Sequence, residues 1–132
     1  MQPAFFGMVV KNPAHQPTVA TGARRLCDAA VSWAALEPAP SSFTWTSLDA
    51  EVAAAEQAGA EMTLSLGMTP TWASSAPSAA SAWGEGATVM PQSLDTWDAY
   101  VTAVVTRYKG RIAHYEVSVS YTHLTLPTNR EV

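Results

Sequence analysis

The stretch that decides the fold is SLDAEVAAAEQAGAEMTLSLG, residues 47–67, in which a helical pattern gives way to a strand pattern within two residues. The helical part has an apolar face made of Leu48, Val52 and Ala55. Ser47 is the predicted N-cap, Asp49 lies in the first turn, where the helix dipole favours negative charge, and Gly59 is the residue expected after the helix ends. The strand at 61–67 then starts at once, which is typical of an α/β unit.

The same pattern recurs along the chain. Residues 93–110 form a second predicted helix, again with Ser at the start and Gly at the end, and a strand at 111–117 follows directly. Two earlier apolar segments, 4–10 and 23–31, are also predicted strands. The strand-to-helix connections are long and the helix-to-strand returns are short, which predicts an α/β fold with a parallel sheet, a (β/α)8 barrel or a doubly wound sheet. The connection at 11–22 has two prolines, so any crossover helix there is expected to be short or degenerate.

Composition narrows the class of protein. The chain has 132 residues, of which 48% are hydrophobic and 14% charged, with a formal net charge of −4. These values fit one globular domain with a core, and the scattered basic residues predict neither a nucleic-acid partner nor a membrane partner. Cys27 is the only cysteine and is expected to pack as a small core residue. The start of the sequence is typical of a first strand and not of a signal peptide, but a leader upstream of Met1 would be missed, so localisation stays open. Nothing in the sequence predicts an oligomer.

Familiar cofactor and metal motifs are missing from the sequence. There is no G-x-G-x-x-G fingerprint and no Walker motif, and the GEG at 84–86 is expected only to bend its loop. The three histidines, His15, His114 and His123, are not spaced as metal ligands. No G-x-S-x-G elbow supports a serine nucleophile. We therefore predict no cofactor and no metal.

The long loops are rich in tryptophan, with Trp33, Trp45, Trp72 and Trp83 in them and Trp97 on the stripe of a helix. A flat indole in a cleft binds the apolar face of a sugar ring, but indoles also pack loops onto a core. Core packing is the favoured interpretation for Trp33 and Trp45. For Trp72, which directly follows the strand at 61–67, the two interpretations are balanced.

Three charged residues fall in or next to predicted strands. Arg25 and Asp28 lie in or just past the second strand, and Glu116 alternates with Tyr115 and Val117 in the fourth. Because burying a charge is costly unless it is paired, we expect either buried ion pairs within the sheet or a functional site. Glu116 in particular is expected to be an interior carboxylate that pairs with an arginine of another strand.

Four motifs together resemble a known family: an Arg in strand two, a Trp before an LEP turn, W-x-x-L-D at a helix start, and L-G-x-T-P-x-W-A-S after strand three. In this order they resemble the second and third units of the retaining glycoside hydrolases with (β/α)8 barrels, of the family 39 and family 5 types. WDAYVTAVVTRYKGRIAHYEV at 97–117 is similar to the lead-in to strand four of that family. The resemblance implies a partial (β/α)8 TIM barrel over residues 1–117, acting on β-linked poly- or oligosaccharides.

The resemblance also implies roles for individual residues. Arg25 maps to the family's strand-two arginine beside the catalytic carboxylates, and Asp28, Trp33 and Trp72 map to positions that line the sugar cleft. Glu116 would support the interior, because the family's acid/base Glu would lie four residues later, in a Trp-Asn-Glu-Pro motif. The nucleophile Glu, at the end of strand seven, is also absent, so no catalytic residue is assigned here.

The last segment, 118–132, departs from the family pattern. SVSYTHLTLPTNREV resembles a translated sequencing adapter, so we expect it to be non-native and disordered. Without both catalytic carboxylates, the 132-residue polypeptide is expected to be inactive. Two alternatives remain open: a non-catalytic carbohydrate-binding barrel, or a small α/β interaction domain to which the tail belongs.

Overall fold

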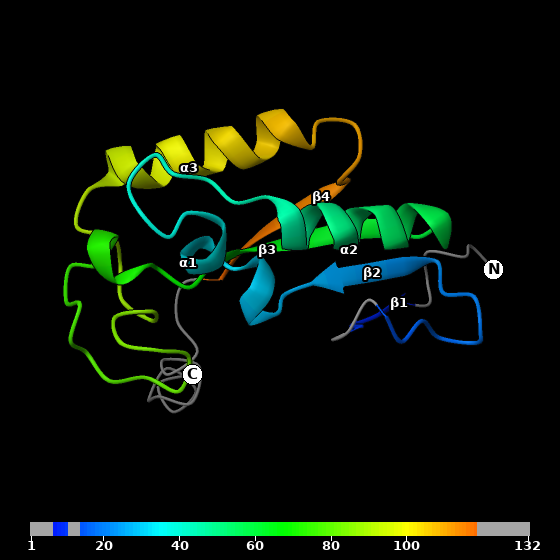
Figure 1. The fold of residues 1–132 in the computed structure, drawn as a ribbon, viewed down its shortest axis with the longest axis horizontal. Coiled ribbons are helices and arrows are strands. Elements are labelled where there is room, and N and C mark those ends of the chain that lie inside the picture. Colours follow the sequence, from blue (N-terminus) through cyan, green and yellow to red (C-terminus); the bar gives the residue numbers. More distant parts are fainter. Residues whose placement is uncertain (1–6, 11–13, 119–132) are drawn as a thin grey trace, which may run out of the picture.

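Four parallel strands form one sheet in the order β1-β2-β3-β4 (Figure 1). The computed structural model describes residues 7–10 and 14–118, so the predicted tail at 119–132 lies outside the described residues. The strands are β1 (Gly7–Met8), β2 (Ala23–Leu26), β3 (Glu61–Gly67) and β4 (His114–Ser118). Sequence-adjacent parallel strands that neighbour each other in space are the arrangement found in a (β/α)8 barrel.

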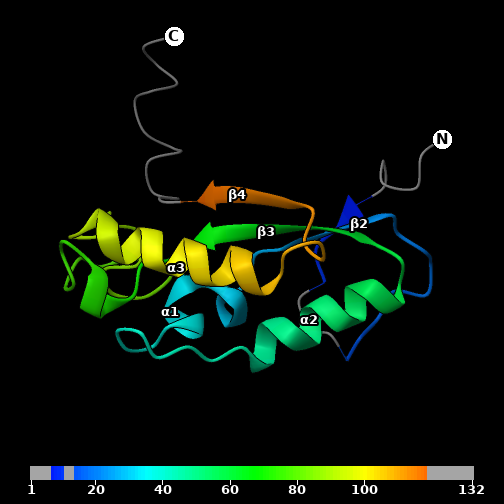
Figure 2. The ribbon, with the colours of Figure 1, turned by 90° about the horizontal axis from the view of Figure 1, so that it is seen from above.

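The helices cover one face of this sheet. They are α1 (Trp33–Leu36), α2 (Thr46–Gln57) and α3 (Leu94–Arg107), with short 3₁₀ turns at Ala29–Val31 and Thr71–Ala73. Figure 2 shows all three helices on the same side of the strands. In the part of the chain that the structure describes, no helix covers the opposite face, which corresponds to the interior of a barrel.

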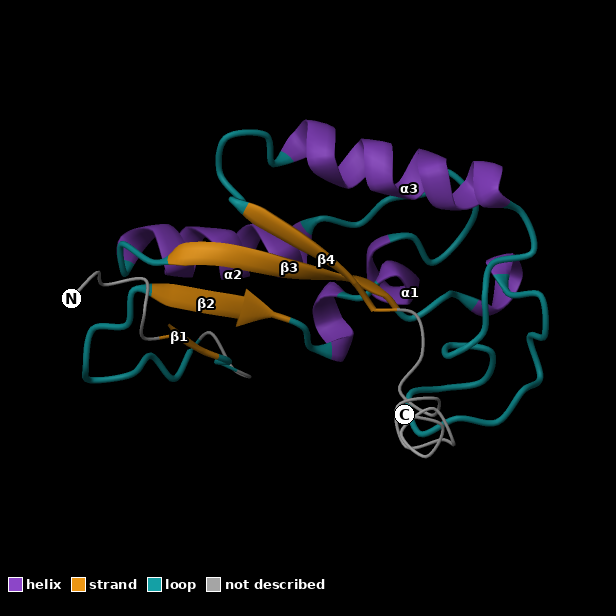
Figure 3. Ribbon diagram, turned by 180° about the vertical axis from the view of Figure 1, so that it is seen from behind, coloured by secondary structure: helices purple, strands orange, loops and turns teal. Residues whose placement is uncertain are grey.

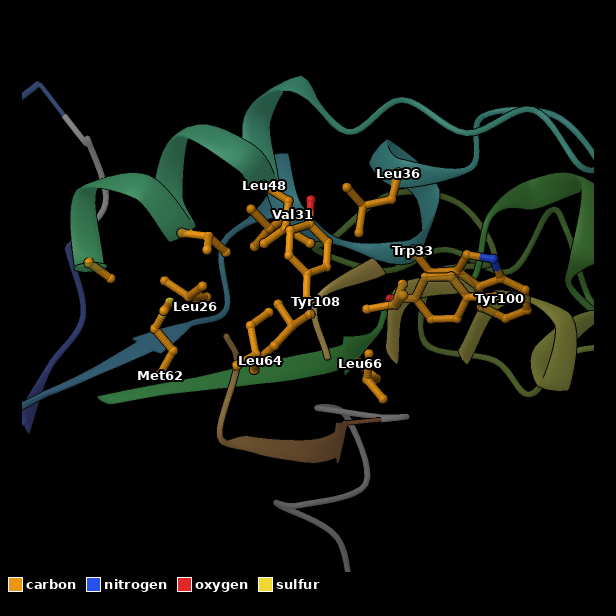
Figure 4. Packing of buried hydrophobic residues seen from close by; sticks show 14 of the residues in the cluster. Leu26, Val31, Trp33, Leu36, Leu48, Met62, Leu64, Leu66, Tyr100 and Tyr108 are labelled. Atoms are coloured by element: carbon orange, nitrogen blue, oxygen red, sulfur yellow. The ribbon is translucent and has the colours of Figure 1, made fainter. Parts of the chain in front are cut away.

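The core lies between the sheet and these helices (Figure 4). Alternate residues of β3 point to the helices and are almost fully buried, namely Met62, Leu64 and Leu66. They meet Leu48 and Val52 of α2 and Tyr100 and Val104 of α3, all with no exposed surface. The alternation of β3 therefore assigns one set of side chains to the core and the other to the open face.

The helix ends confirm most of the predicted caps and correct one. Ser93 caps α3, its Oγ accepting from the Asp95 amide at 3.2 Å. Gly59 and Gly110 follow the helices with φ values of +67° and +80°, the left-handed conformation expected of a C′ glycine. The prediction that Ser47 caps α2 is wrong, because the helix begins at Thr46 and Trp45 occupies the cap position without a side-chain hydrogen bond.

Strand bounds differ from the sequence pattern at three places. Of the strand predicted at 4–10, the described residues 7–10 form a strand only at Gly7–Met8. The strand predicted at 23–31 ends at Leu26, since the Asp28 carboxylate accepts from the Ala30 amide at 2.7 Å and starts a 3₁₀ turn. The strand predicted at 111–117 begins only at His114. As expected of a degenerate crossover, the described residues 14–22 contain no helix.

Candidate functional site

Three polar side chains from three strands meet on the open face of the sheet. Arg25 of β2 donates through Nε to Glu116 Oε1 of β4 at 2.7 Å, and its Nη2 forms an ion pair with the same oxygen. Ser65 of β3 lies opposite Glu116 in the strand register and donates its hydroxyl to that oxygen too. The predicted pairing of Glu116 with an arginine of another strand is therefore present in the structure.

These two hydrogen-bond donors favour the ionised form of Glu116. The hydrogen bond from Arg25 is the main cause that lowers the pKa of Glu116 below its ordinary value of 4.5, and the bond from Ser65 adds to it. The side chains of Arg25 and Glu116 are 44% and 37% exposed, so solvent weakens their attraction. At neutral pH the group is a carboxylate that balances the guanidinium charge.

The open face is hollow beside this ion pair. A shallow depression of about 490 Å³ lies there, lined by residues at and beside β1 (Gly7, Met8, Val9), by residues of β2 (Ala23, Arg24, Arg25), by Thr63 of β3 and by Glu116 of β4. Asp28 lies just beyond the end of β2, where its carboxylate is engaged as the cap of the 3₁₀ turn. Arg25 and Asp28 both lie towards the C-terminal end of β2. Arg25 contacts Glu116, whereas the Asp28 carboxylate bonds to the Ala30 amide.

Trp33 requires a correction. Its ring has no exposed surface, stacks on Tyr100 with centroids 4.9 Å apart, and donates through Nε1 to Glu37 Oε2 at 2.7 Å. An indole enclosed on all sides offers no face to a sugar, so the implied sugar contact of Trp33 is wrong in this structure. The core-packing interpretation is correct for this residue.

Trp72 lies between core and surface. It is half-buried, meets Trp33 edge-on with centroids 6.1 Å apart, and donates through Nε1 to the Glu37 carbonyl at 2.9 Å. Glu37 therefore binds both indoles and also accepts from the Ser41 amide at 2.9 Å. Glu37 carries no individual signal in the sequence, although the LEP turn that contains it is one of the motifs of the resemblance.

The loop after β3 is a compact structure. Met68 adopts φ +59°, unusual for a residue with a side chain, and its carbonyl accepts from the Ala34 amide at 3.1 Å. Thr69 and Ser75 bond to the segment 86–92, Thr69 through its amide to Ala87 and its hydroxyl to Val89, and Ser75 through its amide to Met90. Backbone strain of this kind is common at functional sites, and no composition signal pointed to Met68.

The described residues hold no group of three or more His, Cys, Asp or Glu side chains suited to a metal ion. Within the same residues, no helix has the length and hydropathy to cross a membrane.

A parallel sheet with helices on one face, charged side chains on the other and long loops at the C-terminal ends of the strands defines the fold class: part of a (β/α)8 barrel. Residues 10–120 match the model of glycosyl hydrolase family 10, so the chain belongs to glycosyl hydrolase family 10. The match confirms the class of glycoside hydrolase that the motifs indicated, with family 10 in place of the family 39 and family 5 types.

A solved structure agrees with this fold. Xylanase B from Clostridium stercorarium F9 is similar to the chain with a TM-score of 0.57 and 21% sequence identity. The similarity covers 84% of this chain and 37% of the xylanase chain. The chain therefore spans little more than a third of the length of that xylanase chain.

Proposed function

We propose that this chain is the N-terminal part of a glycosidase that cleaves β-linked polysaccharides. The observation that carries the proposal is the family 10 match across residues 10–120 of a chain whose strands and helices follow the barrel order. Xylan is the first substrate to test, since the similar solved structure is described as a xylanase.

In this proposal the open face of the sheet forms part of the sugar-binding cleft. Arg25 offers guanidinium donors to sugar hydroxyls or to a neighbouring carboxylate, and Glu116 keeps that guanidinium in place. Asp28 and Trp72, at the strand ends, supply an acceptor and a partly exposed indole. The family resemblance noted in the sequence supports these roles.

Glu116 does not fit the part of the acid in glycoside hydrolysis. A general acid needs a raised pKa to hold its proton near neutral pH, whereas Arg25 and then Ser65 lower the pKa of Glu116. We propose instead that Glu116 positions the Arg25 guanidinium. The retaining mechanism needs two carboxyl groups about 5–5.5 Å apart, and we place the acid/base four residues after Glu116 in the native reading frame and the nucleophile on a later strand.

The test is to recover the native reading frame and assay its product. We expect hydrolysis of a β-linked polysaccharide such as xylan, with net retention of the anomeric configuration by proton NMR, and no turnover by the 132-residue chain. A folded full-length product that binds β-linked chains without cleaving them would support a non-catalytic carbohydrate-binding barrel. Cleavage of α-linked glucans alone would contradict the proposal.

A further inference from the structure

Arg24 and Arg25 are adjacent in β2, but their side chains lie on opposite faces of the sheet. Arg25 is exposed on the open face, where it pairs with Glu116. Arg24 is 2% exposed and lies on the side of the helices, as the alternation of side chains along a strand requires. Burying a guanidinium is costly unless acceptors surround it, so the partners of Arg24 decide what the residue does there.

The described residues leave the Arg24 guanidinium incompletely bonded. Its Nη2 donates to Gln16 Oε1 at 2.5 Å, whereas Nε and Nη1 are buried without a hydrogen-bond partner. Glu51 of α2 does not supply the missing acceptor, because the two side chains form no ion pair within the described ranges and Glu51 Oε2 is itself buried without a partner. Burial is the main cause that raises the pKa of Glu51 above 4.5, and Arg24 opposes that rise from a distance.

Arg24 lies in the wall of a cavity of about 370 Å³ between α2 and the connection that precedes β2. Figure 3 shows the described part of this connection, 14–22, as a teal loop beside the start of β2. Five polar residues line the cavity, namely Gln16, Thr18, Thr21, Arg24 and Gln57, and the described residues that line it include no acidic one. Thr21 Oγ1 is also buried without a partner, so two lining side chains have hydroxyl or guanidinium donors to spare.

The charge around this cavity favours an anion. The last turn and the C-cap of α2 supply Ala54, Gln57 and Ala58 to its wall, and the carbonyl end of a helix contributes about half a negative charge. The full positive charge of the guanidinium outweighs that half charge. Gln16 is exposed and offers Nη2 only a neutral amide oxygen, so an oxyanion that takes its place is attracted more strongly.

From this geometry we propose that the cavity is a binding site for a small oxyanion, a phosphate or a carboxylate group, with the Arg24 guanidinium and the Thr21 hydroxyl as its donors. The site goes beyond the proposed function, because it lies between α2 and the connection before β2 and does not use the Arg25–Glu116 pair of the open face. The two neighbouring arginines then have separate tasks, one in the sheet interior and one in anion binding.

The experiment follows thermal unfolding of the 132-residue chain by intrinsic tryptophan fluorescence, at low micromolar concentration in Tris chloride of constant ionic strength near neutral pH. The probes are inorganic phosphate and acetate, each titrated against sodium chloride. An anion that binds only the folded chain raises the unfolding midpoint with its concentration, and the rise gives the Kd. Arg24→Met is compared with Lys109→Met, which removes a positive charge from an exposed position. Circular dichroism checks the fold of each variant.

We expect phosphate to raise the midpoint of the unaltered chain and of Lys109→Met equally, beyond the effect of sodium chloride. Arg24→Met should weaken phosphate binding roughly tenfold or more, about the effect of one lost hydrogen bond to a charged group. This variant should fold, because replacing a buried charge by an apolar side chain is often neutral or stabilising. A larger rise with phosphate than with acetate supports a phosphate group as the ligand, and the reverse order supports a carboxylate.

Thr21→Val tests the same site without changing its charge, so the test does not depend on the folding of Arg24→Met. It should weaken phosphate binding roughly threefold, as expected for one neutral hydrogen bond. Equal phosphate effects in the unaltered chain and in both site variants would show a non-specific salt effect and overturn the inference. The absence of any rise with phosphate or acetate in the unaltered chain would overturn it too, and either result would leave the proposed function standing.

Discussion

Glu116 shows how its neighbours decide the chemistry of a carboxylate. Its position in β4 is that of an interior residue, close in sequence to the place proposed for the acid/base. Arg25 and Ser65 both donate to the same oxygen, and this keeps the group ionised.

Removing either hydrogen-bond partner should raise the pKa of Glu116, and removing Arg25 should raise it more than removing Ser65. Arg25→Met removes the largest cause of the lowered pKa and should raise the pKa of Glu116, and Ser65→Ala should raise it less. Carbon-13 NMR of the glutamate side-chain carboxyl during a pH titration measures both shifts. A pKa that stays unchanged in Arg25→Met would show that the ion pair does not form in solution.

Trp33 is fully buried and Trp83 is 50% exposed, so substituting each of them tests which tryptophan contributes to the core. Trp33→Ala should lower the free energy of unfolding by about 3–5 kcal/mol, because it empties a site packed by Tyr100 and Trp97 and leaves Glu37 Oε2 without the indole donor. Trp83→Ala should change it by no more than about 0.5 kcal/mol. Urea denaturation of the two variants measures both changes in the free energy of unfolding. Equal decreases in the two variants would contradict the assignment of Trp33 to the core.

Elements with a clear apolar period were predicted well from the sequence. The strand at 61–67 has the same bounds in the structure, and the helix predicted at 93–110 begins after its predicted cap. The short helix α1 (Trp33–Leu36) was not predicted, because four residues give no period and its order depends on the Met68 carbonyl bonding to Ala34 from a distant part of the chain. Long-range hydrogen bonds of this kind leave no local signal.

The end of β3 packs against β4 with no room for a side chain. A Cβ at Gly67 would lie 1.8 Å from the Ser118 carbonyl oxygen, so Gly67→Ala must displace one of the two strands. Gly59→Ala is the matched control: it forces an alanine into φ +67° but meets no atom of the described residues within 4 Å, and should cost about 1 kcal/mol.

We expect Gly67→Ala to destabilise the protein clearly more than Gly59→Ala in thermal unfolding. Hydrogen exchange should show the added loss at the β3 and β4 amides. Equal destabilisation by the two substitutions would mean that β4 does not pack against the end of β3 as described.

Helices α2 and α3 are joined by a pH-sensitive contact. Asp49 accepts from Arg107 Nη2 at 2.7 Å and from the Tyr108 hydroxyl at 2.6 Å, and these bonds, Arg107 first, lower the pKa of Asp49 below its ordinary value of 3.8. The folded state then binds its proton less readily than the unfolded state. This contribution to stability is present above pH 3.8 and is lost as the pH falls through the lower folded value.

Asp49→Asn should therefore reduce stability near neutral pH and flatten the fall of stability below pH 4. Chemical denaturation at a series of pH values measures the difference. Since Asp49 is partly exposed, solvent screening keeps the effect small. A variant whose pH profile parallels that of the unaltered protein would rule out this contact as a source of acid sensitivity.

For the whole molecule, the α/β architecture and the pairing of Glu116 with an arginine were easier to predict from the sequence than the burial of the aromatic residues. The order of the elements and the short helix-to-strand connections predict a parallel sheet. The alternation of side chains along the fourth strand predicts that Glu116 faces away from Tyr115 and Val117. Whether Trp33 faces a cleft or the core depends on Tyr100 and Trp97, which lie more than sixty residues away in the chain. The residues next to Trp33 in the sequence do not predict these distant partners.

The described sheet has two unpaired edges, β1 and β4, and an uncovered interior face. We expect the isolated 132-residue chain to associate with itself as its concentration rises, because unpaired strand edges and exposed apolar residues such as Val117 template further pairing. Sedimentation velocity over a concentration series tests this. A monomer at every concentration, with a single cooperative unfolding transition, would contradict it.

The most direct test of the account is to sequence the source DNA across the codon for residue 118 and through the rest of the reading frame. The account predicts that the frame continues after Val117 as Trp-Asn-Glu-Pro and encodes the remaining strands and helices of a family 10 barrel, with a second catalytic Glu on a later strand. A genomic frame that encodes SVSYTHLTLPTNREV and then stops would contradict it, and would favour a small α/β domain with no catalytic site of this kind.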